Sequence, residues 1–355
     1  MREKIISSLQ QQLECGEALL VTSHANRFYL TGFPSSAGQV VVTKNHGWFL
    51  VDFRYIEKAR ATIQGLTVCL SGGLDELRGV LTDENVTRLY VETESTTLHQ
   101  YSVLKTALPG IDVQQDNRFD AHLLRLRQCK SDWELQAIRR AQAITDDTFT
   151  YILDRLRPGR TEREIMLDME LYARQHGSDG VAFSYIVVSG KNSALPHGEP
   201  TDKPLENGDF LTMDFGAVVD GYRSDMTRTV AIGGVSEQQQ RVYDTVYRAQ
   251  QAALAAIRPG VSCREVDAVA RKIIDDAGFA GCFGHGLGHS VGIDIHEMPA
   301  FNTRCDTLLE PGMVMTVEPG IYLEGQFGVR IEDMVVVTAD GCENLTLSPK
   351  NLIVV

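Results

Sequence analysis

An internal repeat in the second half of the chain constrains the fold more than any other feature. The segment RPGRTEREI at residues 157–165 returns as RPGVSCREV at residues 258–266. In both copies, Arg-Pro-Gly ends one amphipathic helix and a capping box starts the next. The helices expected before these stops begin in the same way, so that the four boxes are Ser131/Glu134, Thr161/Glu164, Ser236/Gln239 and Ser262/Glu265. Because start, stop and order all recur, we favour a duplicated helix-helix-strand unit around a shared β-sheet over a generic helix stop used twice.

The 355 residues are enough for two domains, and the pattern changes near residue 125. Residues 1–125 alternate strand-like and helix-like stretches, which predicts a small α/β domain. Strands are expected there at 18–24, 38–43, 47–52, 66–71 and 88–93, and helices at 55–61, 74–81 and 98–108. Residues 123–130 are expected to lead into a second domain, residues 126–355, which contains the repeat. The junction of its two halves is a natural place for a cleft.

A β-hairpin is expected around Asp220-Gly221, because Asp-Gly between two β-rich runs is among the strongest hairpin signals. The two runs are residues 209–219 and 222–232. With Asp-Gly as the turn, Asp214 lies diagonal to Asp225 on one face of the hairpin. Diagonal neighbours are about 7–8 Å apart, so both carboxylates can reach two metal ions that lie about 3.5–4 Å apart.

The alternative for these two acids is a polar stripe that faces solvent. For Asp225, which lies near Arg223 and Arg228, this alternative explains the sequence as well as metal binding does. Asp214 lies between Met213 and Phe215, and a carboxylate in such an apolar stretch is usually paired or bound to a metal.

Glu318 and Glu332 form a second pair of embedded acids. Residues 313–318 are an apolar run that ends in Glu318 and stops at a Pro-Gly dipeptide, which predicts a strand. Residues 328–338 alternate as one strand and place Arg330 and Glu332 on the same face. Taken alone, an Arg–Glu pair on the surface is the simpler explanation. Beside three other embedded acids, we favour metal ligands.

Glycine occupies every second position of GHGLGH at residues 284–289, where two histidines are spaced like a helical zinc pair. A helix is disfavoured there because of these glycines, which instead let the backbone pass close to a ligand. We expect a short strand at residues 291–297. A single histidine is usually a satisfied structural residue. However, four of the nine histidines lie in glycine- or proline-marked segments near the acids: His197, His285, His289 and His296.

Five sequence blocks resemble the signature blocks of the proline-specific pita-bread metallopeptidases, the family of Xaa-Pro aminopeptidase and Xaa-Pro dipeptidase (prolidase). They are SALPHG, TMDFGAVVDGYRSDMTRT, GHGLGHSVGIDIHE, TVEPGIY and GVRIED. The resemblance covers nearly the whole chain. It implies an α/β (α+β) protein, in which a smaller N-terminal α/β domain of the creatinase type precedes a pita-bread domain. In the pita-bread domain, the duplicated units surround a curved, mainly antiparallel sheet.

The resemblance implies a site with two divalent metal ions. Asp214 binds one ion, His289 and Glu318 bind the other, and Asp225 and Glu332 bridge the two. Four carboxylates and one imidazole form an oxygen-rich donor set, which favours Mn²⁺, with Co²⁺ or Zn²⁺ as alternatives.

The resemblance also implies catalytic roles, in a reaction whose nucleophile is a metal-activated water. Glu318 moves the proton. His197 and His296 hold the substrate carbonyl and stabilise the tetrahedral oxyanion. His285 contacts the residue after the scissile bond, and Arg330 orients Glu332 or the bridging carboxylates.

The expected activity is that of an Xaa-Pro aminopeptidase, which acts on peptides with proline at the second position. The compact length resembles short bacterial Xaa-Pro aminopeptidases slightly more than dipeptidases. The main alternative is an Xaa-Pro dipeptidase acting on free dipeptides, and the sequence does not separate the two. More distant alternatives are a creatinase-like amidinohydrolase, which works without metals, and a non-catalytic binding homologue. The complete set of five ligands disfavours both, and the N-terminal domain disfavours methionine aminopeptidase.

Composition excludes several other classes of protein. The net charge of −13 argues against a nucleic-acid partner. No apolar run approaches the length of a membrane span, and the N-terminus lacks the apolar region of a signal peptide. The seven cysteines contain no C-x-x-C and are expected to be free thiols in a reducing cytoplasm. By resemblance, the protein is expected to be a homodimer.

Overall fold

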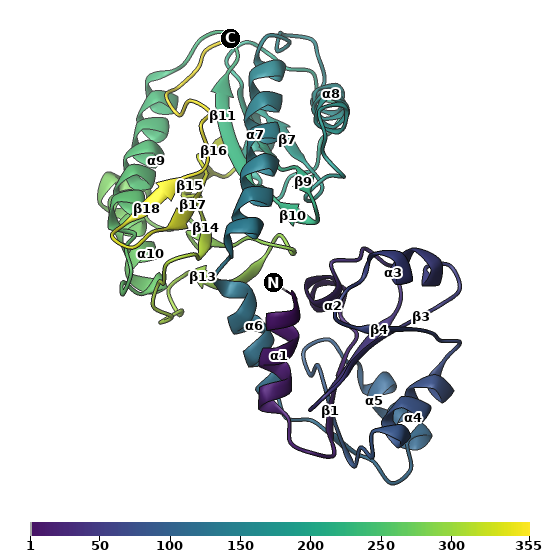
Figure 1. The fold of residues 1–355 in the computed structure, drawn as a ribbon. Coiled ribbons are helices and arrows are strands. Elements are labelled where there is room, and N and C mark those ends of the chain that lie inside the picture. The colour runs from purple at the N-terminus through teal and green to yellow at the C-terminus, as the bar shows by residue number, and fades with distance from the viewer. Residues whose placement is uncertain (1) are drawn as a thin grey trace. The chain divides into compact units, whose positions relative to one another are not determined.

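Residues 2–355 are described by a computed structural model, in which the chain divides into two compact units (Figure 1). The first unit ends at Arg127, and the second runs from Gln128 to Val355. The segment expected to connect the two domains belongs largely to helix α6 (Arg118–Gln128). Among residues 2–355, no helix combines the length and the apolar character that crossing a membrane requires.

A six-stranded sheet in the order β4-β3-β2-β1-β5-β6 forms the centre of the first unit. The strands are β1 (Glu17–Val21), β2 (Gln39–Thr43), β3 (Gly47–Val51), β4 (Thr67–Leu70), β5 (Arg88–Val91) and β6 (Asp112–Gln114). The helices besides α6 are α1 (Arg2–Gln12), α2 (His24–Thr31), α3 (Ile56–Thr62), α4 (Leu74–Asp83) and α5 (Leu98–Ala107). Three consecutive valines of β2 are fully buried, as β-branched residues of a central strand are expected to be.

The strands and helices predicted for the first unit are confirmed, but helix α2 and the short edge strand β6 were not predicted. The strand predicted at residues 18–24 ends at Val21 instead. It ends there because the Ser23 side chain accepts a hydrogen bond from the Asn26 amide and caps helix α2.

The second unit contains two helix pairs and a set of antiparallel strands between them. The helices are α7 (Asp132–Leu153), α8 (Glu162–Gln175), α9 (Glu237–Ala256) and α10 (Cys263–Ile274). Buried residues of α7 and α8 pack on β7 (Ile186–Ser189), β8 (Phe210–Phe215) and β11 (Met226–Ala231). Those of α9 and α10 pack on β14 (Val314–Val317), β16 (Phe327–Arg330) and β17 (Asp333–Val337). In Figure 1, the strands β11, β14, β16 and β17 lie between α7 and the pair α9 and α10.

Two sheets of the second unit carry the candidate site. One has the order β11-β8-β7, and the other has the order β13-β12-β14-β17-β18. The strands not yet given are β9 (Val218–Val219), β10 (Tyr222–Arg223), β12 (Gly288–Ser290), β13 (Glu297–Phe301), β15 (Gly320–Leu323) and β18 (Cys342–Asn344). Strands β9 and β10 pair with each other, as do β15 and β16. The Glu332 amide donates to the Thr227 carbonyl at 3.1 Å and thereby links the two sheets.

The predicted duplication is confirmed. All four predicted capping boxes are present. The backbone pairing after each helix stop also repeats, because the Gly159 amide donates to the Leu205 carbonyl at 2.9 Å and the Gly260 amide donates to the Leu309 carbonyl at 2.9 Å. The two glycines have φ of 90° and 83°, a conformation that glycine adopts readily.

The predicted hairpin is confirmed in its turn and its register. Asp220 and Gly221 have φ of 51° and 79°, as a type I′ turn requires. Strand β9 pairs with β10, and β8 pairs with β11 in the same register. The ladder is interrupted at Gly216, where a Cβ atom would lie 1.9 Å from the Ser224 carbonyl oxygen. Asp225 lies at this interruption, directly before β11.

Two strand predictions in the second unit are wrong. Residues 328–338 form two strands rather than one, because β16 pairs with β15 while β17 pairs with β14. At Glu332 the chain passes from pairing with β15 to pairing with β14. The Glu332 amide itself donates to the carbonyl of Thr227, in the first half of the repeat. Residues 291–296 form a loop rather than a strand, and only Glu297 begins β13. In this loop, the amides of Ile293 and Asp294 donate to the Glu297 side chain instead of to a neighbouring strand.

Candidate metal centre

A cleft of about 1170 Å³ in the second unit contains every predicted site residue. The predicted ligands come from separate elements of both halves of the repeat. Asp214 is in β8 and His289 is in β12. Asp225 precedes β11, Glu318 follows β14, and Glu332 lies between β16 and β17. Asp214 is therefore paired within the ladder near the end of β8, whereas the other three acids lie outside the strands, each directly beside a strand end.

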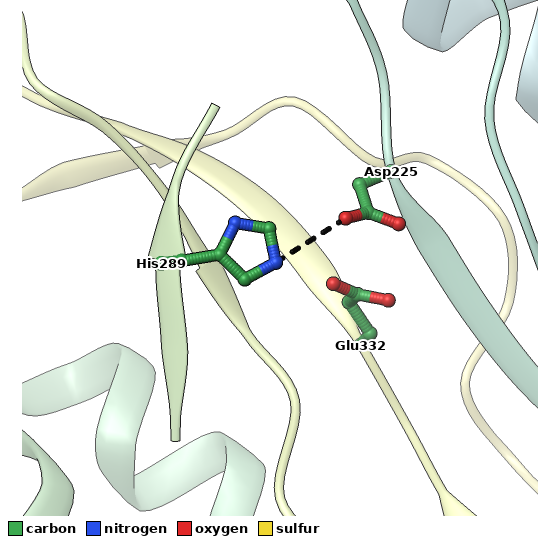
Figure 2. A group of neighbouring side chains, drawn as sticks. All are labelled: Asp225, His289 and Glu332. Carbon is green, nitrogen blue, oxygen red and sulfur yellow. Dashed lines mark ion pairs between the residues drawn. The ribbon is translucent and has the colours of Figure 1, made fainter. Parts of the chain in front are cut away.

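The side chains of Asp225, His289 and Glu332 converge on one point (Figure 2). One ligand atom from each lies within 4.8 Å of the others, as three donors around one ion would. The Nε2 atom of His289 lies 3.5 Å from Asp225 Oδ2 and 3.5 Å from Glu318 Oε1. The Nδ1 atom of His289 lies 3.1 Å from the Ser290 carbonyl oxygen. This contact assigns the ring proton to Nδ1 and leaves the lone pair of Nε2 facing the carboxylates.

Two buried carboxylate oxygens at this point, Asp214 Oδ1 and Glu332 Oε1, have no hydrogen-bond partner among residues 2–355. The other oxygen of each carboxylate accepts a hydrogen bond. Asp214 Oδ2 accepts from Arg330 Nη2 at 2.7 Å, and Glu332 Oε2 accepts from the Thr227 hydroxyl at 2.8 Å. A buried charged oxygen without a donor is costly, so the two orphaned atoms fit direct bonds to divalent cations.

The directions of the pKa shifts show that burial, and then the neighbouring acids, disfavour the ionised form of these carboxyls. Burial raises the pKa of Asp225 and Glu332 well above the usual range, and the neighbouring carboxylates raise both further. Burial, with Asp214 beside it, raises the pKa of Glu318 to about 8, although Arg330 acts in the opposite direction. Divalent cations would supply the missing positive charge and return all three carboxyls to their ionised form. Burial and His296 lower the pKa of His289 to about 4, which keeps the imidazole neutral, as a metal ligand must be.

Arg330 contacts Asp214 directly but reaches Glu332 only through Thr227. Its Nη2 atom donates to Asp214, and its Nε atom donates to the Thr227 hydroxyl at 3.0 Å. That hydroxyl in turn donates to Glu332. The resemblance implied that Arg330 orients Glu332 or the bridging carboxylates. In the structure, its direct carboxylate partner is the acid from the first half of the repeat, which stands opposite β16.

Arg330 also starts a chain of hydrogen bonds to His285. Its Nη1 atom donates to the Tyr322 hydroxyl at 2.9 Å, and this hydroxyl lies 2.9 Å from His285 Nε2. The Nδ1 atom of His285 lies 2.8 Å from the Gly286 carbonyl oxygen, so the Tyr322 hydroxyl is the donor to Nε2. Burial and Arg330 lower the pKa of His285 to about 4. The His285 ring is therefore neutral and held at both nitrogens.

The other two predicted histidines, His197 and His296, line the same cleft. The His296 ring stands edge-on to the His289 ring, with 4.5 Å between ring centroids. Burial and His197 lower the pKa of His296.

Three polar side chains that contact the site were missed in the sequence: Thr227, Thr316 and Tyr322. The Thr316 hydroxyl accepts from the His289 amide at 3.0 Å and lies 3.3 Å from Glu318 Oε1. A signal for it was present. LENGDFLTMD at residues 205–214 returns as LEPGMVMTVE at residues 309–318, which places the last threonine and acid of each copy at equivalent positions. No comparable pattern marks Tyr322, whose role follows from its partners.

Known proteins resemble the chain over both units. Residues 136–339 match the Metallopeptidase family M24, and residues 4–129 match the Creatinase/Prolidase N-terminal domain. The structure of an Xaa-Pro dipeptidase from Bacillus anthracis has a TM-score of 0.94 and 37% identity, covering 100% of this chain and 99% of that one. The X-Pro aminopeptidase from Thermotoga maritima has a TM-score of 0.91 and 35% identity, covering 98% and 100%. An Xaa-Pro dipeptidase of Pyrococcus horikoshii is 32% identical over 95% of this chain and 94% of that protein.

Proposed function

Because the chain belongs to Metallopeptidase family M24, we propose that it is an Xaa-Pro dipeptidase, which hydrolyses free dipeptides that end in proline. The family and these relatives support the coarser description directly: a metal-dependent hydrolase of the Xaa-Pro peptidase group, with a pita-bread domain behind an N-terminal α/β domain. The expected aminopeptidase becomes the second candidate, because the relatives from B. anthracis and P. horikoshii are dipeptidases. The T. maritima aminopeptidase, at similar identity, keeps that candidate in view.

The observation that carries the dipeptidase proposal is an unpaired cation in the cleft, Arg304. The other arginines that line the cleft are engaged: Arg163 by Asp202, Arg271 by Asp267 and Arg330 by Asp214. Within residues 2–355, the guanidinium of Arg304 has no hydrogen-bond or ion-pair partner. A free dipeptide carries its carboxylate on the residue after the scissile bond, and a guanidinium is the side chain best suited to bind it. A longer peptide has an amide at that position and gains nothing from Arg304.

We also propose that Asp214, Asp225, His289, Glu318 and Glu332 hold two divalent ions, with Mn²⁺ favoured by the oxygen-rich donors. When bound, such ions polarise a scissile carbonyl and lower the pKa of a water molecule toward neutrality. The orphaned oxygens of Asp214 and Glu332 support this proposal. It predicts that exhaustive chelation abolishes activity and that Mn²⁺ or Co²⁺ restores it.

The predicted catalytic side chains have the following proposed roles in the reaction. Glu318 accepts and returns the proton of the attacking water, since its carboxylate lines the cleft beside the proposed ligand His289 and would be ionised with the metal ions bound. His296 and His197 contact the substrate carbonyl as it becomes an oxyanion. His285, fixed by Tyr322, contacts the proline. Arg330 positions Asp214 directly.

Proline after the scissile bond is favoured because its tertiary amide has no N–H. A secondary amide would bring a donor into the cleft at a cost of roughly 1–3 kcal/mol if no acceptor faces it. Pro196 and His197 could line the proline pocket together with His285. A matched pair of substrates, Xaa-Pro and Xaa-Ala, compared by kcat/KM, tests this selectivity. Equal values of kcat/KM for the two substrates would show that the protein has the family's metal-site residues but not its preference for proline.

Arg304→Met tests the dipeptide proposal most directly. We expect its kcat/KM on an Xaa-Pro dipeptide to fall by about 10–100-fold, mainly through KM, because one charge-assisted bond is lost. Its activity on the corresponding Xaa-Pro amide should change little. Arg163→Met is the matched control, since that arginine lines the same cleft but is paired with Asp202. Faster cleavage of Xaa-Pro-Yaa peptides than of dipeptides, together with an unaffected Arg304→Met variant, would favour the aminopeptidase.

Two further proposals concern the cellular compartment and the oligomeric state of the protein. The seven cysteines are all free, which suits a reducing cytoplasm. A homodimer is proposed from the resemblance alone, and light scattering at micromolar concentration would test it. The proposed partner is a peptide substrate; neither nucleic acid nor a membrane is proposed.

A further inference from the structure

The His296 ring lies in the cleft without a hydrogen bond that would hold it. It packs edge-on against His289, but neither of its ring nitrogens has a hydrogen-bond partner among residues 2–355. His285, by contrast, is held at both nitrogens. The position of His296 therefore depends on the backbone of the 291–296 loop, which forms no strand.

The carboxylate of Glu297 binds backbone amides of this loop. Glu297 Oε1 accepts hydrogen bonds from the Ile293 amide at 3.0 Å and from the Asp294 amide at 3.2 Å. The carboxylate also packs against Gly292, where a Cβ atom would lie 2.7 Å from both carboxylate oxygens. The Glu297 carboxylate is thus the acceptor for amides that would pair with the carbonyls of a neighbouring strand elsewhere in the sheet.

A buried lysine holds the carboxylate in turn. Lys130 Nζ lies 3.3 Å from Glu297 Oε2, and the two side chains are 1% and 5% exposed. Lys130 Nζ also lies 3.0 Å from the hydroxyl of Ser290, the residue after His289. The same ammonium therefore contacts both ends of the loop.

The other side of the loop is held by Arg223. Its backbone amide donates to the Gly292 carbonyl at 3.0 Å, and its Nε atom donates to the Ile293 carbonyl at 2.8 Å. Arg223 lies two residues before Asp225, so the first half of the repeat fixes the loop at the same place where it supplies a metal ligand.

We propose that Glu297, supported by Lys130, is a positioning residue that places His296 over the metal centre. This inference rests on the proposed function, in which His296 contacts the substrate carbonyl. Glu297 is not among the residues that line the cleft; it acts through the two amides of the loop. Its removal should displace the His296 ring while the five predicted ligands keep their places.

A double-mutant cycle of Glu297→Ala and His296→Ala tests this role. In the background with His296, we expect Glu297→Ala to lower kcat by about 10–100-fold, the range in which small displacements of a catalytic group fall. In the His296→Ala background, the same change should lower kcat by less than about 2-fold, because the residue that Glu297 positions is already absent. KM and metal content should stay near those of the parent protein.

Hydrogen exchange gives a readout that does not depend on activity. The amides of Ile293 and Asp294 should exchange faster in Glu297→Ala, with or without His296, while the amides of β14 stay protected. The double variant Glu297→Gln with Lys130→Met keeps an acceptor oxygen and removes the buried charge pair. It should retain most of the parent kcat and protect the two loop amides.

Glu92→Ala is the matched control, because the Glu92 carboxylate accepts from two consecutive amides, those of Thr22 and Ser23, in the first unit. It should lower the unfolding temperature, and any change in kcat should be equal in both backgrounds. Equal losses of kcat for Glu297→Ala in both backgrounds, or unchanged exchange of the loop amides, would overturn the positioning role. If His296→Ala alone leaves kcat unchanged, the proposed role of His296 fails, while the exchange experiment still decides whether Glu297 holds the loop.

Discussion

Two adjacent carboxylates, those of Glu332 and Asp333, are both buried but have opposite surroundings. Asp333 accepts hydrogen bonds from Arg228 at 2.9 Å and Gln250 at 2.9 Å, and it lies 2.5 Å from Lys350 Nζ. Burial alone would raise the pKa of Asp333, but Arg228 and Lys350 outweigh it and lower the pKa. The positive charges that stabilise the ionised Asp333 carboxylate therefore come from side chains of the protein itself.

The Glu332 carboxylate has no cation in direct contact among residues 2–355. It accepts one hydroxyl, from Thr227, and its second oxygen has no partner among residues 2–355. Burial, and then Glu318 and Asp214, raise its pKa well above the usual range. Side chains alternate between the two faces of a strand, so neighbouring residues can enter different clusters. The difference teaches that the structural acid cluster brings its own counter-charge, whereas the candidate metal cluster pairs an arginine with Asp214 and leaves the rest of the counter-charge to be supplied from outside.

The largest effect is expected for Glu332→Gln, which removes a proposed bridging ligand. Metal affinity should fall by at least about 10²-fold, the upper range for loss of a single outer partner of a ligand. Activity should fall with it, and elemental analysis after dialysis measures the loss. Without metal, this variant should unfold at a higher temperature than the parent above neutral pH, because a neutral amide replaces a disfavoured buried charge. Full metal content in the variant would remove Glu332 from the ligand set.

The opposite outcome is expected for Asp333→Asn. The change leaves Arg228 and Lys350 without their anion, and breaking a buried ion pair from one side typically costs about 3–5 kcal/mol of unfolding free energy. Urea unfolding of the metal-free protein would measure it. Metal content should remain close to that of the parent, since Asp333 faces the other cluster. A variant that loses metal but keeps its stability would reverse the assignment of the two neighbours.

The smallest effect is expected from pH, and its sign differs between the clusters. In the metal-free protein, the pKa of Glu318 is raised from 4.5 to about 8, so the folded state keeps a proton that the unfolded state releases. Metal-free stability should therefore fall as pH rises from about 4.5 toward about 8, and bound metal should abolish that slope. The contribution of Asp333, whose pKa is lowered, is present above 3.8 and is lost as pH falls further. Melting temperatures with and without chelator would measure both slopes; a metal-free protein that gains stability through this interval would contradict the first.

Local hydrogen bonding accounts for the predictions that are confirmed. The Asp220-Gly221 turn, the capping boxes and the register of the hairpin depend on contacts within a few residues. They can be read from short patterns for that reason. The choice of candidate ligands stays a prediction, but it too rests on a local pattern, because a carboxylate in an apolar stretch needs a partner wherever that stretch lies.

Contacts between distant segments account for the wrong strands. Residues 328–338 alternate like one strand, but the partner of the chain changes at Glu332, where the first half of the repeat binds its amide. Residues 291–296 carry a strand-like pattern, yet the Glu297 carboxylate takes the amides that a ladder would use. In both places the alternation is genuine, and a tertiary hydrogen bond overrides it.

The sequence by itself determined the two-domain α/β organisation, the duplicated unit and the residues that enter the candidate metal centre. Only the tertiary structure decided which partner each residue takes. Arg330 meets Asp214, 116 positions away, and reaches Glu332 only through Thr227. Such pairs depend on which strands lie side by side and on how far each side chain reaches, and no local pattern in the chain carries that information.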